Sequence, residues 1–311
     1  MRVRGLQGSS PIGWKGRPPE FRREARFAYA LIMPSLLLMV GLIVVPFFYA
    51  FWISLHRVNF LFPGRPFIGL ENYVYMTTNK DFWASVGRTI YFTAVSVVTQ
   101  TVLGIAIAQL LNKPFRGRII VRTLLLLPWA IPTVVNGTLW RWILDGSTGA
   151  LNHLLLQLGL IKHNVIWLGR PFLAMNMVIL GDSWRMLPLY VIMFLAGLQA
   201  IPEDLYDAAR VDGATSWDCF RYVTLPFLRP VILVVLILRT LQTFRVFDII
   251  YVMTRGGPAN GTMVITFLTY FTTFKFQNFG YGAALAFFIG ITTLGMAWVY
   301  IRTLRGREEA L

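Results

Sequence analysis

Long apolar runs separated by short polar segments dominate this chain. Six runs cover roughly Phe27–Ile53, Thr89–Leu111, Ile119–Leu144, Phe172–Leu198, Phe227–Met253 and Gly282–Ile301. A helix rises about 1.5 Å per residue, so each run is long enough to cross a hydrocarbon core of about 30 Å. The runs do not alternate between apolar and polar residues, as the strands of a membrane barrel do. We therefore predict an all-α membrane protein with six transmembrane helices.

The composition agrees with this prediction. Of the 311 residues, 56% are hydrophobic and 14% are charged, and the mean hydropathy is +0.60. Soluble domains are about 25% charged, and so apolar a chain needs lipid as its solvent. The third run is the least regular, because Pro128 and Pro132 interrupt it, while Trp140 and Trp142 suit the membrane interface.

Basic residues predict the orientation of the spans. If the N-terminus is cytoplasmic, the inside segments hold seventeen Lys and Arg residues and the outside segments hold eight. This asymmetry favours both termini in the cytoplasm. It also accounts for much of the net charge of +15 without nucleic-acid binding. We expect a cytoplasmic arm over 1–27, a six-helix domain over 28–303 and a cytoplasmic tail over 304–311.

The segment Gln199–Pro230, on the predicted cytoplasmic side, is the most informative polar stretch. Pro202 suits the first turn of a helix, where Glu203 and Asp204 interact favourably with the helix dipole. Gly213 either ends this helix or allows a close approach. The segment is net acidic, whereas helices lying on lipid usually have a basic face. Docking to a protein is favoured over an interfacial helix.

This segment resembles the cytoplasmic EAA loop of ATP-binding-cassette importer permeases. It reads Asp207-Ala208-Ala209, Asp212-Gly213-Ala214 and, after eight further residues, Val223-Thr224-Leu225-Pro226. Asp207 replaces the usual Glu and Val223 the usual Ile. The resemblance implies a type I importer permease fold, with the loop acting as a coupling helix in a groove of the ATPase. The residues implied in this coupling are Glu203, Asp207, Ala208, Ala209, Asp212, Gly213, Ala214, Leu225 and Pro226.

Two other stretches resemble carbohydrate-uptake permeases of the maltose and glycerol-phosphate type. They are Phe67–Tyr73 and Phe244–Pro258. The resemblance implies a permease in a prokaryotic plasma membrane that imports a sugar, oligosaccharide or polyol phosphate. It also implies a second permease, two copies of an ATPase that binds ATP and Mg²⁺, and an extracytoplasmic solute-binding protein. This chain itself would bind no cofactor and would not be an enzyme.

Polar residues inside the spans are candidates for a substrate path, because they are costly in lipid and usually face a cavity or a partner. They are Arg141, Asp182, Arg185, Arg239, Gln242, Arg245 and Asp248. Arg245 and Asp248 would share a helix face and could form an ion pair without touching substrate. Gln242 and Trp184 suit sugar hydroxyls and the apolar face of a sugar ring, although Trp184 also suits an interfacial anchor. We take Trp184, Gln242, Arg245 and Asp248 as the candidate path.

Two other classes of function remain as alternatives. A stand-alone secondary transporter would carry its own coupling-ion site and often internal repeats, and neither is evident. A membrane enzyme would need a catalytic constellation, and the sequence shows no triad, no metal cluster and no phosphate-binding loop. His56, His153 and His163 lie in separate connecting regions without metal-ligand spacing.

Overall fold

The computed structural model describes residues 19–60 and 64–308, with side chains for 26–60 and 64–302. These residues form helices and, besides them, only two isolated β-bridges. The α-helices are α1 (Pro19–Met39), α2 (Val45–Ser54), α3 (Glu71–Thr78), α4 (Lys80–Asn112), α5 (Arg118–Leu125), α6 (Leu127–Ala130), α7 (Thr133–Ile143), α8 (Ala150–Gln157), α9 (Pro171–Gln199), α10 (Glu203–Val211), α11 (Ser216–Asp218), α12 (Leu225–Phe244), α13 (Asp248–Met253), α14 (Ile265–Tyr270) and α15 (Phe279–Glu308). Three π segments are η2 (Val40–Val44), η3 (Cys219–Thr224) and η4 (Phe271–Lys275). The chain divides into two compact units, Met1–Trp52 and Ile53–Leu311, which are described separately.

The first unit consists, in its described part, of α1, η2 and most of α2. The apolar helix runs from Arg26 to Ser54 and matches the first predicted span. In η2 the Val45 N–H binds the Val40 carbonyl, one residue further back than in an α-helix. This wider turn ends two residues before Pro46, whose ring would otherwise crowd the carbonyl four residues back. The helix begins at Pro19, inside the predicted arm, and residues 1–18 of that arm lie outside the described residues.

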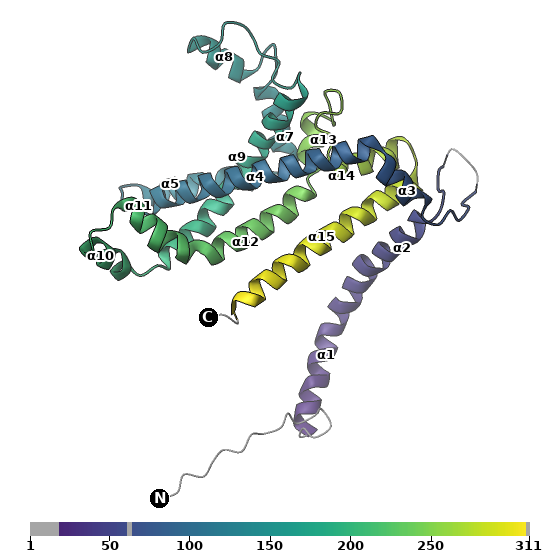
Figure 1. The fold of residues 1–311 in the computed structure, drawn as a ribbon, viewed down its shortest axis with the longest axis horizontal. Coiled ribbons are helices and arrows are strands. Elements are labelled where there is room, and N and C mark those ends of the chain that lie inside the picture. The colour runs from purple at the N-terminus through teal and green to yellow at the C-terminus, as the bar shows by residue number, and fades with distance from the viewer. Residues whose placement is uncertain (1–18, 61–63, 309–311) are drawn as a thin grey trace, which may run out of the picture. The chain divides into compact units, whose positions relative to one another are not determined.

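Four long helices, α4, α9, α12 and α15, form the frame of the second unit (Figure 1). Helices α4, α9 and α12 pack against one another, and α15 packs against α12. Glycines allow the closest approaches: a Cβ at Gly104 would lie 3.0 Å from the Phe194 ring, and one at Gly197 would lie 2.8 Å from Val231. Small residues at such crossings are typical of membrane helix bundles, where close packing replaces the hydrophobic effect.

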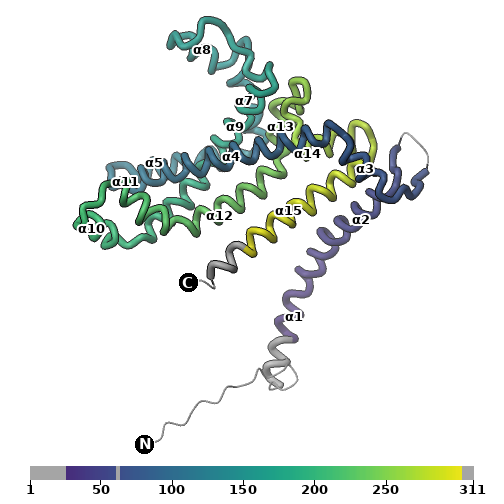
Figure 2. The backbone as a smooth tube through the Cα atoms, in the orientation of Figure 1, coloured from purple at the N-terminus to yellow at the C-terminus, as the bar shows by residue number. Residues whose placement is uncertain are grey.

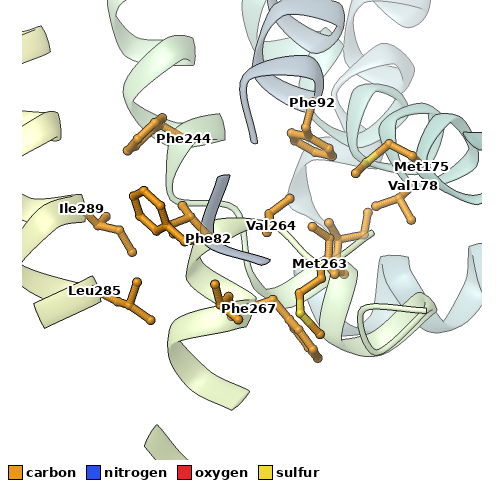
Figure 3. Packing of buried hydrophobic residues seen from close by; sticks show 14 of the residues in the cluster. Phe82, Phe92, Met175, Val178, Phe244, Met263, Val264, Phe267, Leu285 and Ile289 are labelled. Atoms are coloured by element: carbon orange, nitrogen blue, oxygen red, sulfur yellow. The ribbon is translucent and has the colours of Figure 1, made fainter. Parts of the chain in front are cut away.

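Two apolar clusters hold the second unit together. Figure 3 shows the first, in which Phe82 and Phe92 of α4 lie among side chains such as Val264, Phe267 and Leu285 from the C-terminal third of the chain. The second cluster joins α4, α9 and α12 through residues that include Ala108, Phe194 and Leu228, and it extends to Ile201 beyond the end of α9.

The third predicted span is wrong as a single straight helix. The helical run Arg118–Ala130 and helix α7 meet at an angle of 95°. The break falls at Ile131, which has extended backbone angles of −73° and 129°. A proline disfavours helical angles at the residue before it and has no N–H to donate, so Pro132 ends the first arm.

The fifth predicted span is also wrong at its C-terminal end. We expected a helix to Met253, but α12 ends at Phe244 and the separate helix α13 begins at Asp248. The connecting residues lose helical hydrogen bonds, and the Thr266 hydroxyl from α14 donates to the carbonyl of Val246. A side chain far along the chain therefore stabilises this interruption.

The number of crossings agrees with the prediction. In the described part of the chain, five helices are long and apolar enough to cross a membrane, and the bent pair is a sixth candidate. Two spans are longer than expected. Helix α4 starts at Lys80 because the Asn79 side chain accepts a hydrogen bond from the Asp81 N–H and caps it. Helix α15 continues to Glu308, inside the predicted tail, and residues 309–311 lie outside the description.

Candidate functional site: a polar cavity and an exposed loop helix

A cavity of about 370 Å³ opens among the spans of the second unit. It lies beside the break at Pro132 and the interruption between α12 and α13. Trp129 and Thr133 line it from the two sides of the break at Pro132. The end of α12 and the segment that follows it contribute further walls, and α9 supplies the rest. The lining residues are Trp129, Thr133, Asp182, Arg185, Met186, Leu189, Arg239, Gln242, Thr243, Arg245, Val246, Phe247, Asp248 and Ile249.

A buried ion pair joins two helices at the wall of this cavity. Asp182 of α9 and Arg239 of α12 are 4% and 3% exposed, and the guanidinium donates to the carboxylate. Within the part of the chain that the structure describes, the Nε of Arg239 and the Nε of Arg185 have no hydrogen-bond partner. Desolvated charges in an apolar bundle are costly unless they are paired. The arrangement therefore leaves spare donors beside a space large enough for a small polar ligand.

Gln242 is held in position by a neighbour from α9. The Tyr190 hydroxyl donates to its side-chain oxygen over 3.1 Å. A separate polar contact joins α4 and α9: the Gln100 amide donates to the Ser183 hydroxyl over 3.0 Å. Amide and hydroxyl groups of this kind bind ligand hydroxyls readily.

The structure brings together three of the four residues predicted for the substrate path. Gln242, Arg245 and Asp248 line the cavity, whereas Trp184 does not. Trp184 lies edge-on to Trp140 with ring centres 6.0 Å apart. Trp129, between the two prolines that interrupt the third predicted span, lines the cavity and was not among the residues predicted for the path.

The expectation that Arg245 and Asp248 share one helix face is wrong. Helix α12 ends before Arg245, whose Nε donates to the Leu241 carbonyl at 3.2 Å. The ion pair observed between spans is Asp182–Arg239. The rarity of charges in spans identifies both residues as candidates, but it does not identify them as partners.

The loop helix α10 contains Asp207, Ala208 and Ala209 of the stretch that resembles the EAA motif, and it ends at Val211, two residues before Gly213. The Gly213 N–H binds the Arg210 carbonyl at 3.0 Å, and the Ala214 N–H binds the Ala209 carbonyl at 2.9 Å. This pair of bonds is the Schellman motif, which needs a left-handed residue after the helix, and Gly213 has φ +83°. A Cβ at Gly213 would meet nothing within 4 Å. Of the two roles expected for Gly213, the helix stop is present, and no close approach occurs within the described chain.

A new helix starts two residues after this turn. Thr215 and Asp218 form a capping box, in which the Asp218 N–H donates to the threonine hydroxyl and the carboxylate accepts from the Thr215 N–H at 2.9 Å. The Thr215 hydroxyl, which also donates to the Asp218 carboxylate, and after it the Thr215 N–H hold the pKa of this carboxyl below its usual range. From Ser216 the chain is helical without interruption to Phe244. Figure 2 shows α10 and α11 at one end of α12. Leu225 and Pro226 therefore lie within one continuous helix.

The motif Phe244–Pro258 forms one side of an aromatic cluster. The rings of Phe247 and Tyr251 lie 5.6 Å apart, and Phe247 lies 5.2 Å from Tyr270 of α14. This packing fixes the segment that carries Arg245 and Asp248 to the cavity. Over the described residues, no group of three or more His, Cys, Asp and Glu side chains is placed to hold a metal ion.

Comparisons with known proteins agree with this geometry. Residues 100–303 match the family model described as binding-protein-dependent transport system inner membrane component. The chain is 40% identical over 287 residues to the trehalose/maltose transport system permease protein MalF of Thermococcus litoralis, covering 92% of this chain and 96% of the relative. It is 36% identical over 280 residues to the trehalose transport system permease protein SugA of Mycobacterium tuberculosis, covering 90% and 89%.

A solved structure shares the fold. A chain of a bacterial ABC transporter involved in import of the acidic polysaccharide alginate superposes with a TM-score of 0.80 at 23% sequence identity, covering 92% of this chain and 97% of that one. This confirms the type I importer permease fold. The family match covers about two thirds of the sequence and includes the loop between α9 and α12. The chain therefore belongs to the inner membrane components of binding-protein-dependent transport systems.

Proposed function

We propose that this chain is the permease subunit of an ATP-driven importer for a neutral sugar such as a disaccharide. The observation that supports this most is the polar cavity between the spans, which combines an amide, guanidinium groups, carboxylates and an indole. Amide, guanidinium and carboxylate groups form hydrogen bonds with sugar hydroxyls, and an indole packs on the apolar face of a sugar ring. The names of the relatives from Thermococcus litoralis and Mycobacterium tuberculosis support the same substrate class.

In this proposal Gln242, Arg245 and Asp248 contact the sugar, and Trp129 takes the stacking role expected earlier of Trp184. Asp248 and Arg245 are exposed to the cavity, so their charges can reorient towards hydroxyls without breaking the buried pair. Tyr190 keeps the Gln242 amide nitrogen free to donate, because it occupies the amide oxygen.

The remaining subunits follow from the importer class. We propose a second permease, two ATPase subunits that bind ATP and Mg²⁺ and hydrolyse the nucleotide, and an extracytoplasmic solute-binding protein. A related solved structure is described as an alginate transporter in complex with a periplasmic protein bound to alginate pentasaccharide. Helix α10 and the adjoining α11 would dock on the ATPase through acidic residues and through exposed apolar side chains, such as Val211 of α10 (87% exposed) and Trp217 of α11 (66% exposed).

The test is uptake by the reconstituted transporter. The permease pair and ATPase are placed in proteoliposomes with the solute-binding protein outside, and labelled trehalose and maltose are measured with and without enclosed ATP. We expect uptake of one of these sugars that depends on ATP. Gln242→Ala should lower it about tenfold, the factor that corresponds to roughly 1.4 kcal/mol of lost hydrogen bonding. Gln157→Ala, on the exposed face of α8, is the matched control.

Two results would contradict the proposal. Sugar uptake driven by a proton or sodium gradient in the absence of ATP would identify a secondary transporter. Equal uptake by the Gln242→Ala and Gln157→Ala variants would place the substrate path elsewhere in the protein.

A further inference from the structure

Tyr206 is the large side chain by which helix α10 packs against the apolar core of the second unit. Most residues of this helix are exposed, but the ring of Tyr206 packs against the second apolar cluster, which joins α4, α9 and α12. Its hydroxyl lies 2.9 Å from the hydroxyl of Thr224. Thr224 is 4% exposed, so this contact is sheltered from water.

Thr224 lies where the helix that begins in the loop continues into the fifth span. It is the last residue of η3, directly before α12 begins at Leu225, and it belongs to the continuous helix Ser216–Phe244. The contact therefore connects the middle of α10 to the base of the span that carries Arg239 and Gln242 to the cavity. Along the chain the two residues are 18 positions apart, and that path passes through the turn at Gly213.

The covalent path alone gives α10 freedom to pivot. It is joined to α9 through Ala200–Pro202 and to α11 through Asp212–Thr215, and both connections are short non-helical segments. A displacement applied to α10 can be absorbed by rotation about these segments. A third attachment away from both of them restricts such rotation, and the pair Tyr206–Thr224 supplies it.

We propose that Tyr206 and Thr224 form a tether that makes α10 and α12 move together, so that displacement of the docked helix reaches the cavity. The inference rests on the proposed function of α10 as the ATPase-docking element, and it adds two positioning residues that the EAA resemblance does not include. The hydrogen bond contributes because each hydroxyl loses its buried partner if the helices separate. The ring of Tyr206 supplies packing in addition.

Single-group substitutions separate the hydrogen bond from the packing. Tyr206→Phe keeps the ring and removes only the hydroxyl, and Thr224→Val keeps the branched shape without the hydroxyl. Thr224→Ser retains a hydroxyl, and Tyr222→Phe removes one from a tyrosine that is exposed in this chain. The complete transporter is reconstituted with each variant. ATPase retention, ATP hydrolysis and sugar uptake are measured in one preparation.

We expect Tyr206→Phe and Thr224→Val to retain the ATPase and to hydrolyse ATP, while sugar transported per ATP falls about fivefold. That factor corresponds to loss of one hydrogen bond of roughly 1 kcal/mol. Thr224→Ser should restore the ratio, and Tyr222→Phe should leave it unchanged. A purely structural role would instead lower the amount of assembled transporter at an unchanged ratio, and this result would overturn the tether.

Comparison with a turn variant separates failure of the tether from failure of the docking function. If Gly213→Val disrupts uptake but both hydroxyl deletions keep the ratio of the unaltered transporter, the loop couples without the tether and the inference is wrong. If neither Gly213→Val nor the hydroxyl deletions affect uptake or ATPase retention, the docking function of α10 is itself wrong.

Discussion

Asp182 and Arg239 place opposite charges in a part of the chain where ionised groups are rare. Neither residue reaches water to any extent, and both belong to helices that line the cavity. Burying two charges costs several kcal/mol per ion, and the pairing compensates for this cost only while both partners are present. The pair therefore holds α9 and α12 at one relative rotation, and that rotation brings Arg185 and Gln242 to the same cavity.

The consequence is a non-additive effect of substitutions. We expect Arg239→Gln to destabilise the permease by about 3–5 kcal/mol, because it leaves the Asp182 carboxylate buried without a partner. The double variant Asp182→Asn/Arg239→Gln should recover most of that loss, because two neutral amides can bond to each other. The measurement is the thermal unfolding of detergent-purified permease by tryptophan fluorescence. A double variant less stable than Arg239→Gln would contradict the account.

Prolines and a glycine determine the form of the helices that surround the site. Pro132 turns one predicted span into two arms, whereas Pro46 and Pro226 are the second residues of α-helices that continue from π segments. The difference arises because a single wider turn can relieve the clash of a proline ring, whereas extended angles at the preceding residue end the helix. Gly213 ends α10 by a third route, the left-handed turn of the Schellman motif.

The turn at Gly213 yields a prediction that separates backbone strain from side-chain bulk. A branched residue in the left-handed region costs about 1–2 kcal/mol or more, so Gly213→Val should open the turn and abolish most uptake. Asn tolerates these angles, and a side chain here meets nothing within the chain, so Gly213→Asn should keep at least half of the uptake. Uptake and pull-down of the ATPase are measured in the same cells. Unimpaired uptake in the Val variant would show that this turn is not part of the coupling element.

The helix bundle of the second unit has two ends with different polar segments. The loop helix α10 and the start of α12 lie at one end. The connection that contains α8 runs from the C-terminus of α7 to the N-terminus of α9, at the other end of α9 from α10. The excess of Lys and Arg around the first end gives the orientation, because cytoplasmic loops of membrane proteins are enriched in these residues. Both termini and α10 are therefore expected in the cytoplasm, and α8 outside it.

Labelling of single cysteines checks this orientation. In a Cys219→Ala background, Asp207→Cys on α10 and Gln157→Cys on α8 both place a thiol at an exposed position. A membrane-impermeant maleimide applied to intact cells should label position 157 and spare position 207 until the membrane is permeabilised. The opposite pattern would reverse the orientation and would exclude docking of α10 on a cytoplasmic ATPase.

The sequence by itself determined the features that depend on local chemistry. The spans are visible because transfer of about 20 apolar residues into lipid outweighs the details of packing. Backbone sterics marked Gly213 as a helix stop or a point of close approach, and Pro132 as an interruption of its span. The acidic start of α10 follows from the helix dipole. Three cavity residues, Gln242, Arg245 and Asp248, were identified because polar groups in a span need a polar environment.

Only the tertiary structure decided which faces of the helices meet. One sequence does not specify the rotation of a membrane helix, because lipid and protein neighbours are almost equally apolar. Trp184 was consequently assigned to the path in place of Trp129. Arg245 and Asp248 were expected on one helix face, whereas Asp182 and Arg239 form the buried pair between helices. The end of α12 depends on the hydroxyl of Thr266, and the tether depends on Thr224, which lies 18 residues from Tyr206. Such contacts arise from packing between distant segments, and no local pattern encodes them.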